Sequence, residues 1–89
     1  MKHVTIYTLN YCPYCKRAKT ILREKNISFE EIDVTENEET KTKEIAEKYN
    51  IKNDVTFPQI IIGEQRIGGC SDLEQLILDG KFDDLMKEE

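Results

Sequence analysis

Two cysteines separated by two residues, in the run Cys12-Pro13-Tyr14-Cys15, are the side chains of this sequence best suited to chemistry. The thiolate form of cysteine is the nucleophile, and the first cysteine of a C-x-x-C pair at a helix start ionises more readily than a free thiol. Cys12 is therefore the candidate nucleophile, and Cys15, one turn further along, is the candidate resolving thiol. The spacing predicts thiol–disulfide exchange.

The residues on either side of this pair predict a strand followed by a helix. Residues 4–9 have the β-branched and aromatic content of a strand, and from residue 13 to residue 25 apolar side chains recur at helical spacing. Pro13 suits the first helical position because it needs no N–H donor there. Cys12 then becomes the N-cap, and its sulfur lies at the positive end of the helix dipole.

Basic residues follow the pair at once and make the start of this helix unusual. Lys16, Arg17 and Lys19 oppose the helix dipole, but their charge favours a nearby thiolate. We assign Lys16, which is nearest the thiol, to the candidate site. For Arg23 and Lys25, attraction of acidic thiol substrates and a solvated helix face remain equal alternatives.

Two other uses of the cysteine pair are less consistent with the sequence. Cys70 and His3 could complete a four-ligand zinc site with Cys12 and Cys15, but no second paired-ligand motif accompanies them. A structural disulfide across so short a loop would constrain the unfolded chain little. We therefore predict no metal site.

Composition and length limit the remaining classes of function. The 89 residues are enough for one domain, expected to span residues 1–89, and the net charge of -5 disfavours nucleic-acid binding. The sequence has no apolar run of transmembrane length and no signal-peptide pattern, so no membrane partner is expected. Three cysteines, an odd number, agree with a reducing compartment. We expect a cytoplasmic monomer.

The rest of the chain predicts an α/β fold. Residues 27–34 suggest a second strand, parallel to the first because a helix connects them. Thr35 and Glu38 fit a capping box that opens a polar helix, and Ser71 and Glu74 fit another. Between them, Pro58 leads a strand over residues 59–62, and a turn and an antiparallel strand over residues 65–67 follow. With a last helix near residues 82–86, the order is β-α-β-α-β-β-α-α, a four-stranded mixed sheet flanked by helices.

The combination of C-P-Y-C, a proline-led third strand and the Gly-Gly-x-x-Asp turn at residues 68–72 resembles the dithiol glutaredoxins of the thioredoxin-like superfamily. The resemblance covers essentially the whole chain. It implies glutathione-dependent reduction of protein disulfides and of protein–glutathione mixed disulfides. Glutathione would then be a co-substrate, with no cofactor bound permanently, and the partners would be disulfide-containing or glutathionylated proteins.

The same resemblance implies a glutathione groove on this chain. Its residues would be Tyr14, Lys16, Thr56, Phe57, Pro58, Gly69, Cys70, Ser71 and Asp72. The Phe57–Pro58 bond is expected to be cis, with the Phe57 backbone pairing with the cysteinyl part of glutathione and Thr56 shaping the turn. The turn at residues 69–72 would bind the γ-glutamyl end, and Asp72 would receive its amino group.

Three departures from the family pattern leave alternatives open. Leu9 occupies the position of a basic residue that contacts the glycyl carboxylate of glutathione, a role open here to Lys16 or Lys52. Phe57 replaces the more usual valine, and Cys70 is either an inert thiol or a third redox thiol. One alternative is a redoxin reduced by a flavoprotein reductase and serving a dedicated target enzyme. Another is a module that binds an iron–sulfur cluster.

Overall fold

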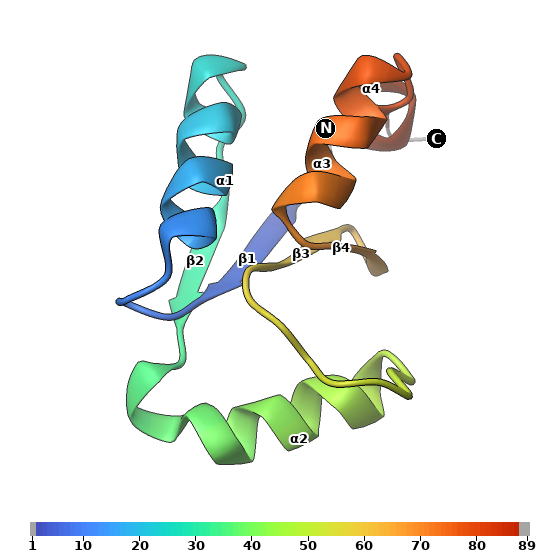
Figure 1. Ribbon diagram of the computed structural model, residues 1–89. Coiled ribbons are helices and arrows are strands. Elements are labelled where there is room, and N and C mark those ends of the chain that lie inside the picture. The colour runs from blue at the N-terminus through green and yellow to red at the C-terminus, as the bar shows by residue number, and fades with distance from the viewer. Residues whose placement is uncertain (1, 88–89) are drawn as a thin grey trace.

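The computed structural model describes residues 2–87, so both ends of the predicted 1–89 domain lie outside the described residues. Four strands form one mixed sheet in the order β2-β1-β3-β4 (Figure 1). The strands are β1 (Val4–Thr8), β2 (Glu30–Asp33), β3 (Gln59–Ile62) and β4 (Gln65–Gly68). The helices are α1 (Pro13–Glu24), α2 (Glu38–Lys48), α3 (Cys70–Leu78) and α4 (Phe82–Met86), and a short 3-10 helix, η1 (Thr35–Asn37), precedes α2. The predicted fold class and order are confirmed.

The strand pairing follows from the connections between the strands. β1 and β2 are joined through α1 and pair in parallel, as predicted, whereas β3 runs antiparallel to both β1 and β4. β3 lies in the interior of the sheet and all four of its residues are buried. This explains its nearly continuous apolar sequence, which is typical of a strand covered on both faces.

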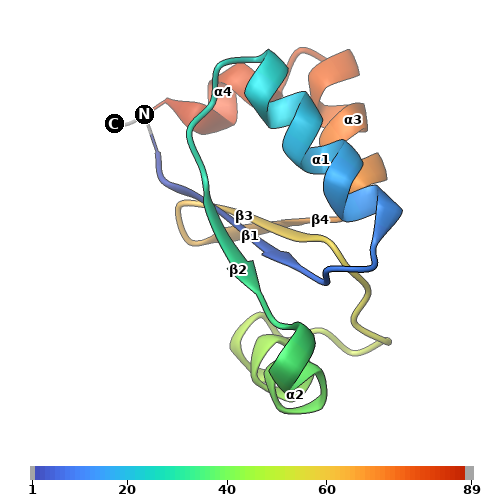
Figure 2. The same ribbon diagram turned by 90° about the vertical axis from the view of Figure 1, so that its left-hand side faces the viewer.

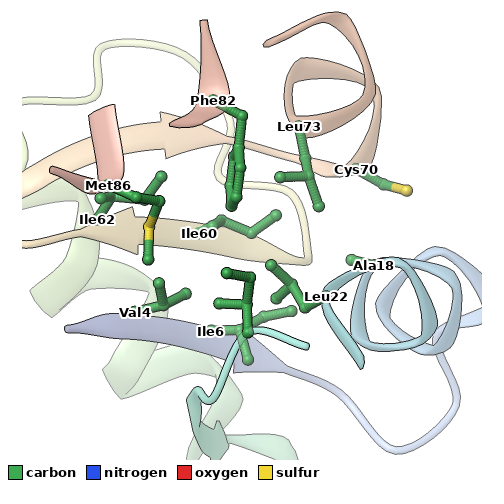
Figure 3. Packing of buried hydrophobic residues seen from close by; sticks show 11 residues of the cluster. Val4, Ile6, Ala18, Leu22, Ile60, Ile62, Cys70, Leu73, Phe82 and Met86 are labelled. Atoms are coloured by element: carbon green, nitrogen blue, oxygen red, sulfur yellow. The ribbon is translucent and has the colours of Figure 1, made fainter. Parts of the chain in front are cut away.

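Helices cover both faces of the sheet. α1, α3 and α4 lie on one face, and α2 lies on the other (Figure 2). The main core fills the space between the sheet and the first group of helices, with Ile6 and Ile60 from the strands meeting Leu22, Leu73 and Phe82 from the helices (Figure 3). Each such side chain contributes about 1.5–3 kcal/mol through burial, so this core fixes α1 and α3 beside each other.

Both capping boxes expected from the sequence are wrong. Thr35 does not cap α2, because its N–H and hydroxyl both donate to the Asp33 carboxylate and its oxygen accepts the N–H of Asn10. These bonds hold Thr35 in η1, and Asn37 becomes the N-cap of α2. The second strand is also shorter than expected, since only Glu30–Asp33 pairs with β1.

The helix after β4 begins two residues earlier than the sequence pattern suggested. Gly69, not Ser71, is the N-cap of α3, and the Asp72 carboxylate accepts the Gly69 N–H at 2.9 Å. Glu74 does not reach back to the helix start but pairs with Arg17 of α1 at 2.7 Å. A carboxylate three residues after the N-cap therefore binds the N-cap amide of α3, in a pair that lies two residues before the predicted one.

Within residues 2–87, no helix is long and apolar enough to cross a membrane.

Candidate active site

The start of α1 presents the Cys12 sulfur to backbone amides. Cys12 is the N-cap, with an extended backbone (φ -106°, ψ 108°), and Pro13 follows as the first helical residue. The Cys15 N–H donates to the Cys12 sulfur at 3.1 Å. A sulfur that receives an amide hydrogen at a helix N-terminus is stabilised as an anion, so the local sequence produces the geometry expected for a nucleophilic thiol.

The two thiols of the pair lie in different surroundings. The exposed fraction is 9% for Cys12 and 1% for Cys15, so only the first can be reached by a substrate. Burial, followed by the interaction with the Cys12 sulfur, raises the pKa of Cys15 from 9.0 to about 12. Cys15 is thus held as a neutral thiol beneath Cys12, which suits a resolving thiol that waits for a mixed disulfide to form.

The basic residues of α1 are not all directed at the thiol, contrary to expectation. Arg17 pairs with Glu74 at 2.7 Å, and Lys19 pairs with Glu31 at 2.8 Å. Glu31, the partner of Lys19, also accepts a hydrogen bond from the Thr8 hydroxyl, and the two contacts lower the pKa of Glu31. The two cations therefore tie α1 to α3 and to β2, in addition to adding positive charge at the active-site end of the helix.

A loop before β3 forms the opposite side of the site. The Cys12 thiol donates to the Phe57 carbonyl oxygen across 3.5 Å, and the Phe57–Pro58 peptide bond is cis, as predicted. Gln59, a buried residue, donates from its amide to the Thr56 carbonyl at 2.7 Å. Gln59 was not singled out from the sequence, although a glutamine at the start of an otherwise apolar strand is a signal for such a positioning bond.

The start of α3 closes the other end of the site. Gly68 has φ +118°, a value that favours glycine, and a Cβ added there would collide with the Asp72 carboxylate. Gly69 lies against the loop, because a Cβ there would come within 3.6 Å of the Pro58 carbonyl. The glycine pair thus lets α3 approach the loop that carries the cis proline.

A cavity of about 420 Å³ joins these three segments. It is lined by Tyr14, Thr56, Phe57, Pro58, Gly69, Cys70, Ser71, Asp72 and Glu74. Eight of these nine residues belong to the groove expected from the sequence. Lys16 is exposed and is not among the described lining residues, while Cys12 borders the cavity through its contact with Phe57.

Glu74 is the lining residue that the sequence reasoning missed. Its two carboxylate oxygens have different partners, the Cys70 thiol at 3.6 Å and the Arg17 guanidinium at 2.7 Å. The signal was the spacing of Cys70 and Glu74, which places them on one face of a helix. Burial and the Glu74 carboxylate raise the pKa of Cys70.

The four residues considered as zinc ligands are not brought together. His3 directly precedes β1, and its Nε2 contacts the Glu30 carboxylate at 3.0 Å. Within residues 2–87, no group of three or more histidine, cysteine or acidic side chains could hold a metal ion.

Comparison with known proteins decides the family. The family model described as Glutaredoxin matches residues 4–67. Glutaredoxin 3 of Escherichia coli K12 is 42% identical over 87 residues, covering 98% of this chain and all of that protein. The chain belongs to the glutaredoxin family. It is therefore assigned to the thiol–disulfide oxidoreductases, in agreement with the geometry of the cysteine pair.

Other glutaredoxins support the assignment in sequence and in structure. The glutaredoxin of Pseudomonas aeruginosa is 44% identical, with 97% of this chain and 98% of that protein covered. The solution structure of the Brucella melitensis glutaredoxin is 45% identical, with a TM-score of 0.78, and 98% of this chain and 90% of that chain are covered. A buckwheat glutaredoxin–glutathione complex, 21% identical with a TM-score of 0.81 and covering 96% of this chain and 76% of that one, shares the fold.

Proposed function

We propose that this protein reduces protein–glutathione mixed disulfides and protein disulfides, with glutathione as the electron donor. The observation that carries the proposal is the 420 Å³ cavity whose lining runs from the cis-proline loop beside Cys12 to the start of α3. Its two ends offer what a γ-glutamyl-cysteinyl peptide needs, a reactive thiol at one end and a helix N-terminus for a carboxylate at the other. The buckwheat glutaredoxin complex with glutathione adds support from a protein of the same fold.

The first step is attack by Cys12 on a mixed disulfide. The Cys12 thiolate attacks the glutathione sulfur, a bond forms between these two sulfurs, and the bond to the target protein breaks. The target sulfur leaves as a thiolate and takes up a proton. The Cys15 amide, 3.1 Å from the Cys12 sulfur, stabilises the attacking charge without rearrangement of the loop.

The second step regenerates the enzyme by one of two routes. In the first, the thiolate of a second glutathione attacks the glutathione sulfur on Cys12, which frees Cys12 and forms glutathione disulfide. In the second, Cys15 attacks the Cys12 sulfur, forms the Cys12–Cys15 disulfide and releases reduced glutathione, which takes the Cys15 proton. Because Cys15 is buried and protonated, we expect the first route to dominate for glutathionylated substrates.

The groove residues would hold the tripeptide in register with Cys12. The Phe57 backbone would pair with the cysteinyl residue, Tyr14 would form one wall, and the γ-glutamyl carboxylate would meet the start of α3. The Gly69 N–H already donates to Asp72, so the amides of Cys70 and Ser71 are the donors open to that carboxylate. Asp72 would accept the amino group of the ligand.

The test is turnover of a glutathionylated peptide, with glutathione as reductant and glutathione disulfide measured as product. Cys12→Ser should lower the rate at least ~1,000-fold, because it removes the nucleophile. Serine is a good N-cap, so this variant should keep the unfolding free energy of the parent chain, which separates chemistry from folding. Cys15→Ser should keep at least about a third of the activity on the same substrate. A Cys12→Ser variant as active as the parent would reject the proposal.

A flavoprotein reductase is the competing electron donor, and two observations favour it. Leu9 stands where a basic residue would contact the glycyl carboxylate, and the charged side chains that line the cavity, Asp72 and Glu74, are both acidic. Reduction of the Cys12–Cys15 disulfide by glutathione and by a thioredoxin-reductase-type flavoenzyme should be compared in one assay. Faster reduction by glutathione supports the proposed donor, and reduction only by the flavoenzyme contradicts it.

A further inference from the structure

The third cysteine lies in the wall of the cavity that the proposed function assigns to glutathione. Cys70 is the first residue of α3 and is 4% exposed. It sits at the edge of the hydrophobic cluster, with its sulfur directed away from the other side chains (Figure 3). The same cavity is lined by Phe57, whose carbonyl contacts the Cys12 thiol. Two thiols therefore border one groove, although the exchange reaction requires only one of them as nucleophile.

The charged and titratable groups around Cys70 come from two helices. From its own helix, Glu74 accepts the Cys70 thiol at 3.6 Å. From α1, the Arg17 guanidinium contacts the other carboxylate oxygen of Glu74 at 2.7 Å. The interaction with Cys12, the N-cap of α1, also raises the pKa of Cys70. Burial and the Glu74 carboxylate raise the pKa of Cys70, and the Arg17 charge acts in the opposite direction.

We propose that Glu74 is a positioning residue that confines exchange in this groove to Cys12, by holding Cys70 as a neutral thiol. The inference rests on the proposed use of glutathione only for the identity of the disulfide that Cys70 is kept from attacking. Arg17 fixes the orientation of the carboxylate, so that one oxygen remains directed at the sulfur. The ion pair that joins α1 to α3 thus serves selectivity as well as packing.

The side reaction that this arrangement prevents can be written in full. A Cys70 thiolate would attack one sulfur of glutathione disulfide, form a Cys70–glutathione disulfide and break the original S–S bond. The released glutathione thiolate would take up the proton that Cys70 had lost, so the oxidant is glutathione disulfide and the product is glutathione. Such a modification would place a glutathionyl group in the wall of the groove and block it.

The two members of the ion pair have opposite predicted effects, which gives the inference a sharp test. Glu74→Gln removes the negative charge beside Cys70 and releases Arg17 to stabilise the thiolate. Arg17→Gln breaks the same ion pair but leaves the carboxylate in place and removes a cation. If the pair acted only by holding α1 and α3 together, both variants would expose Cys70 and both would increase its reactivity.

The experiment measures alkylation of Cys70 by iodoacetamide in the reduced, full-length chain. Trypsin cleaves after Arg66 and Lys81, so Cys70 is in a peptide without the other two cysteines, and its modification can be followed by mass spectrometry. Because the side chains of Glu74 and Arg17 are 37% and 60% exposed, solvent screens their charges. We therefore expect a rise of roughly three- to tenfold for Glu74→Gln, and a rate no higher than the parent for Arg17→Gln.

The matched control is Glu47→Gln, which removes the same charge from an exposed position on α2, across the sheet. It should leave the Cys70 alkylation rate unchanged. In a series of pH values, Glu74→Gln should also shift the rise of alkylation to lower pH, and Arg17→Gln should not. Greater exposure alone would lower the pKa of Cys70 in both variants, because burial is the largest cause of its raised pKa. Equal increases in Glu74→Gln and Arg17→Gln, or no change in Glu74→Gln, would overturn the inference.

A second arm replaces iodoacetamide with glutathione disulfide and measures the glutathionylated peptide. A parallel increase in Glu74→Gln supports both the inference and the admission of glutathione to the groove. An increase with iodoacetamide alone leaves the role of Glu74 supported and counts against glutathione as the ligand of this groove. The failure of the inference is thereby distinguished from the failure of the proposed function.

Discussion

The two helices that border the groove each have a cysteine at their start, as the N-cap of α1 and as the first helical residue of α3, but the two sulfurs meet opposite partners. At the start of α1, the Cys12 sulfur accepts a backbone N–H at 3.1 Å. At the start of α3, the Cys70 thiol lies 3.6 Å from the Glu74 carboxylate. A helix N-terminus favours a thiolate only where the sulfur faces the free amides. One position further along the helix start, burial and the Glu74 carboxylate together raise the pKa of Cys70 and favour its neutral thiol.

The two helix starts also differ in what caps them. α1 is capped by the candidate nucleophile, since the Cys12 sulfur is the acceptor for the Cys15 amide. The N-cap of α3 is a glycine, which has no side chain to accept an N–H, and the Asp72 carboxylate accepts the N–H of that glycine. Chemistry and capping therefore coincide at α1 but are separated at α3, and substitutions should reveal this difference.

The largest effect on stability is expected at the glycine that precedes the α3 cap. Gly68→Ala places a Cβ against the Asp72 carboxylate at φ +118°, so the unfolding free energy should fall by about 2–3 kcal/mol. Urea denaturation measures the change. Gly80→Ala is the control, because Gly80 also has a positive φ, +70°, but its Cβ would meet open space. Equal losses in the two variants would show that the contact with Asp72 does not restrict the start of α3.

The buried thiol of α1 predicts an intermediate effect that depends on pH. Burial raises the pKa of Cys15 from 9.0 to about 12, so between these values the unfolded chain releases a proton that the folded chain retains. The stability contributed by the neutral thiol is complete below pH 9 and is lost as the pH rises towards 12.

This loss can be measured as a difference between two proteins. From about pH 8.5 to about pH 10.5, the stability of the reduced parent relative to Cys15→Ala should fall by about 1–2 kcal/mol. Urea denaturation under reducing conditions gives both values, and the subtraction removes the titration of lysines and tyrosines common to both. Parallel stability curves for the two proteins would contradict the assignment of Cys15 as a buried neutral thiol.

The same contrast explains which parts could be predicted from the sequence. The start of α1 was predicted correctly because it depends on adjacent residues, with Pro13 fixing the first turn and Cys12 capping it. The start of α3 was not, because two overlapping pairs, Gly69 with Asp72 and Ser71 with Glu74, both have the spacing of a capping box. In the structure, Glu74 pairs with Arg17, which is far away in the sequence, and Asp72 is the carboxylate that reaches the N-cap.

A similar competition occurs before α2, where the side chain of Asp33 occupies Thr35. The sheet order and the cavity were more accessible to prediction. Strand alternation and connection length determine the sheet order, and the family resemblance supplied the residues of the cavity. The ion pair between Glu74 and Arg17 remained hidden, because the two residues are far apart in the sequence and no local pattern encodes their contact.

The smallest effect is expected at the α3 cap itself and separates hydrogen bonding from charge. Asp72→Ala removes the acceptor of the Gly69 N–H and should lower the unfolding free energy by about 1 kcal/mol. Asp72→Asn keeps an oxygen acceptor at that position and should lose only about half as much, since it lacks the charge that favours a helix N-terminus. Urea denaturation measures both changes.

The corresponding change at α1, Cys12→Ser, should cost no stability, because serine replaces one capping side chain by another. For enzymatic turnover, the expected ranking is the opposite, with the larger loss at Cys12. Cys12→Ser should abolish activity, whereas both Asp72 variants should keep the maximal rate and raise the KM for a glutathionylated peptide, since the role proposed for Asp72 is to bind the amino group of the ligand. A fall in maximal rate with unchanged KM in Asp72→Asn would mean that the start of α3 contributes to the chemical step, and the division of labour between the two helix starts would then be wrong.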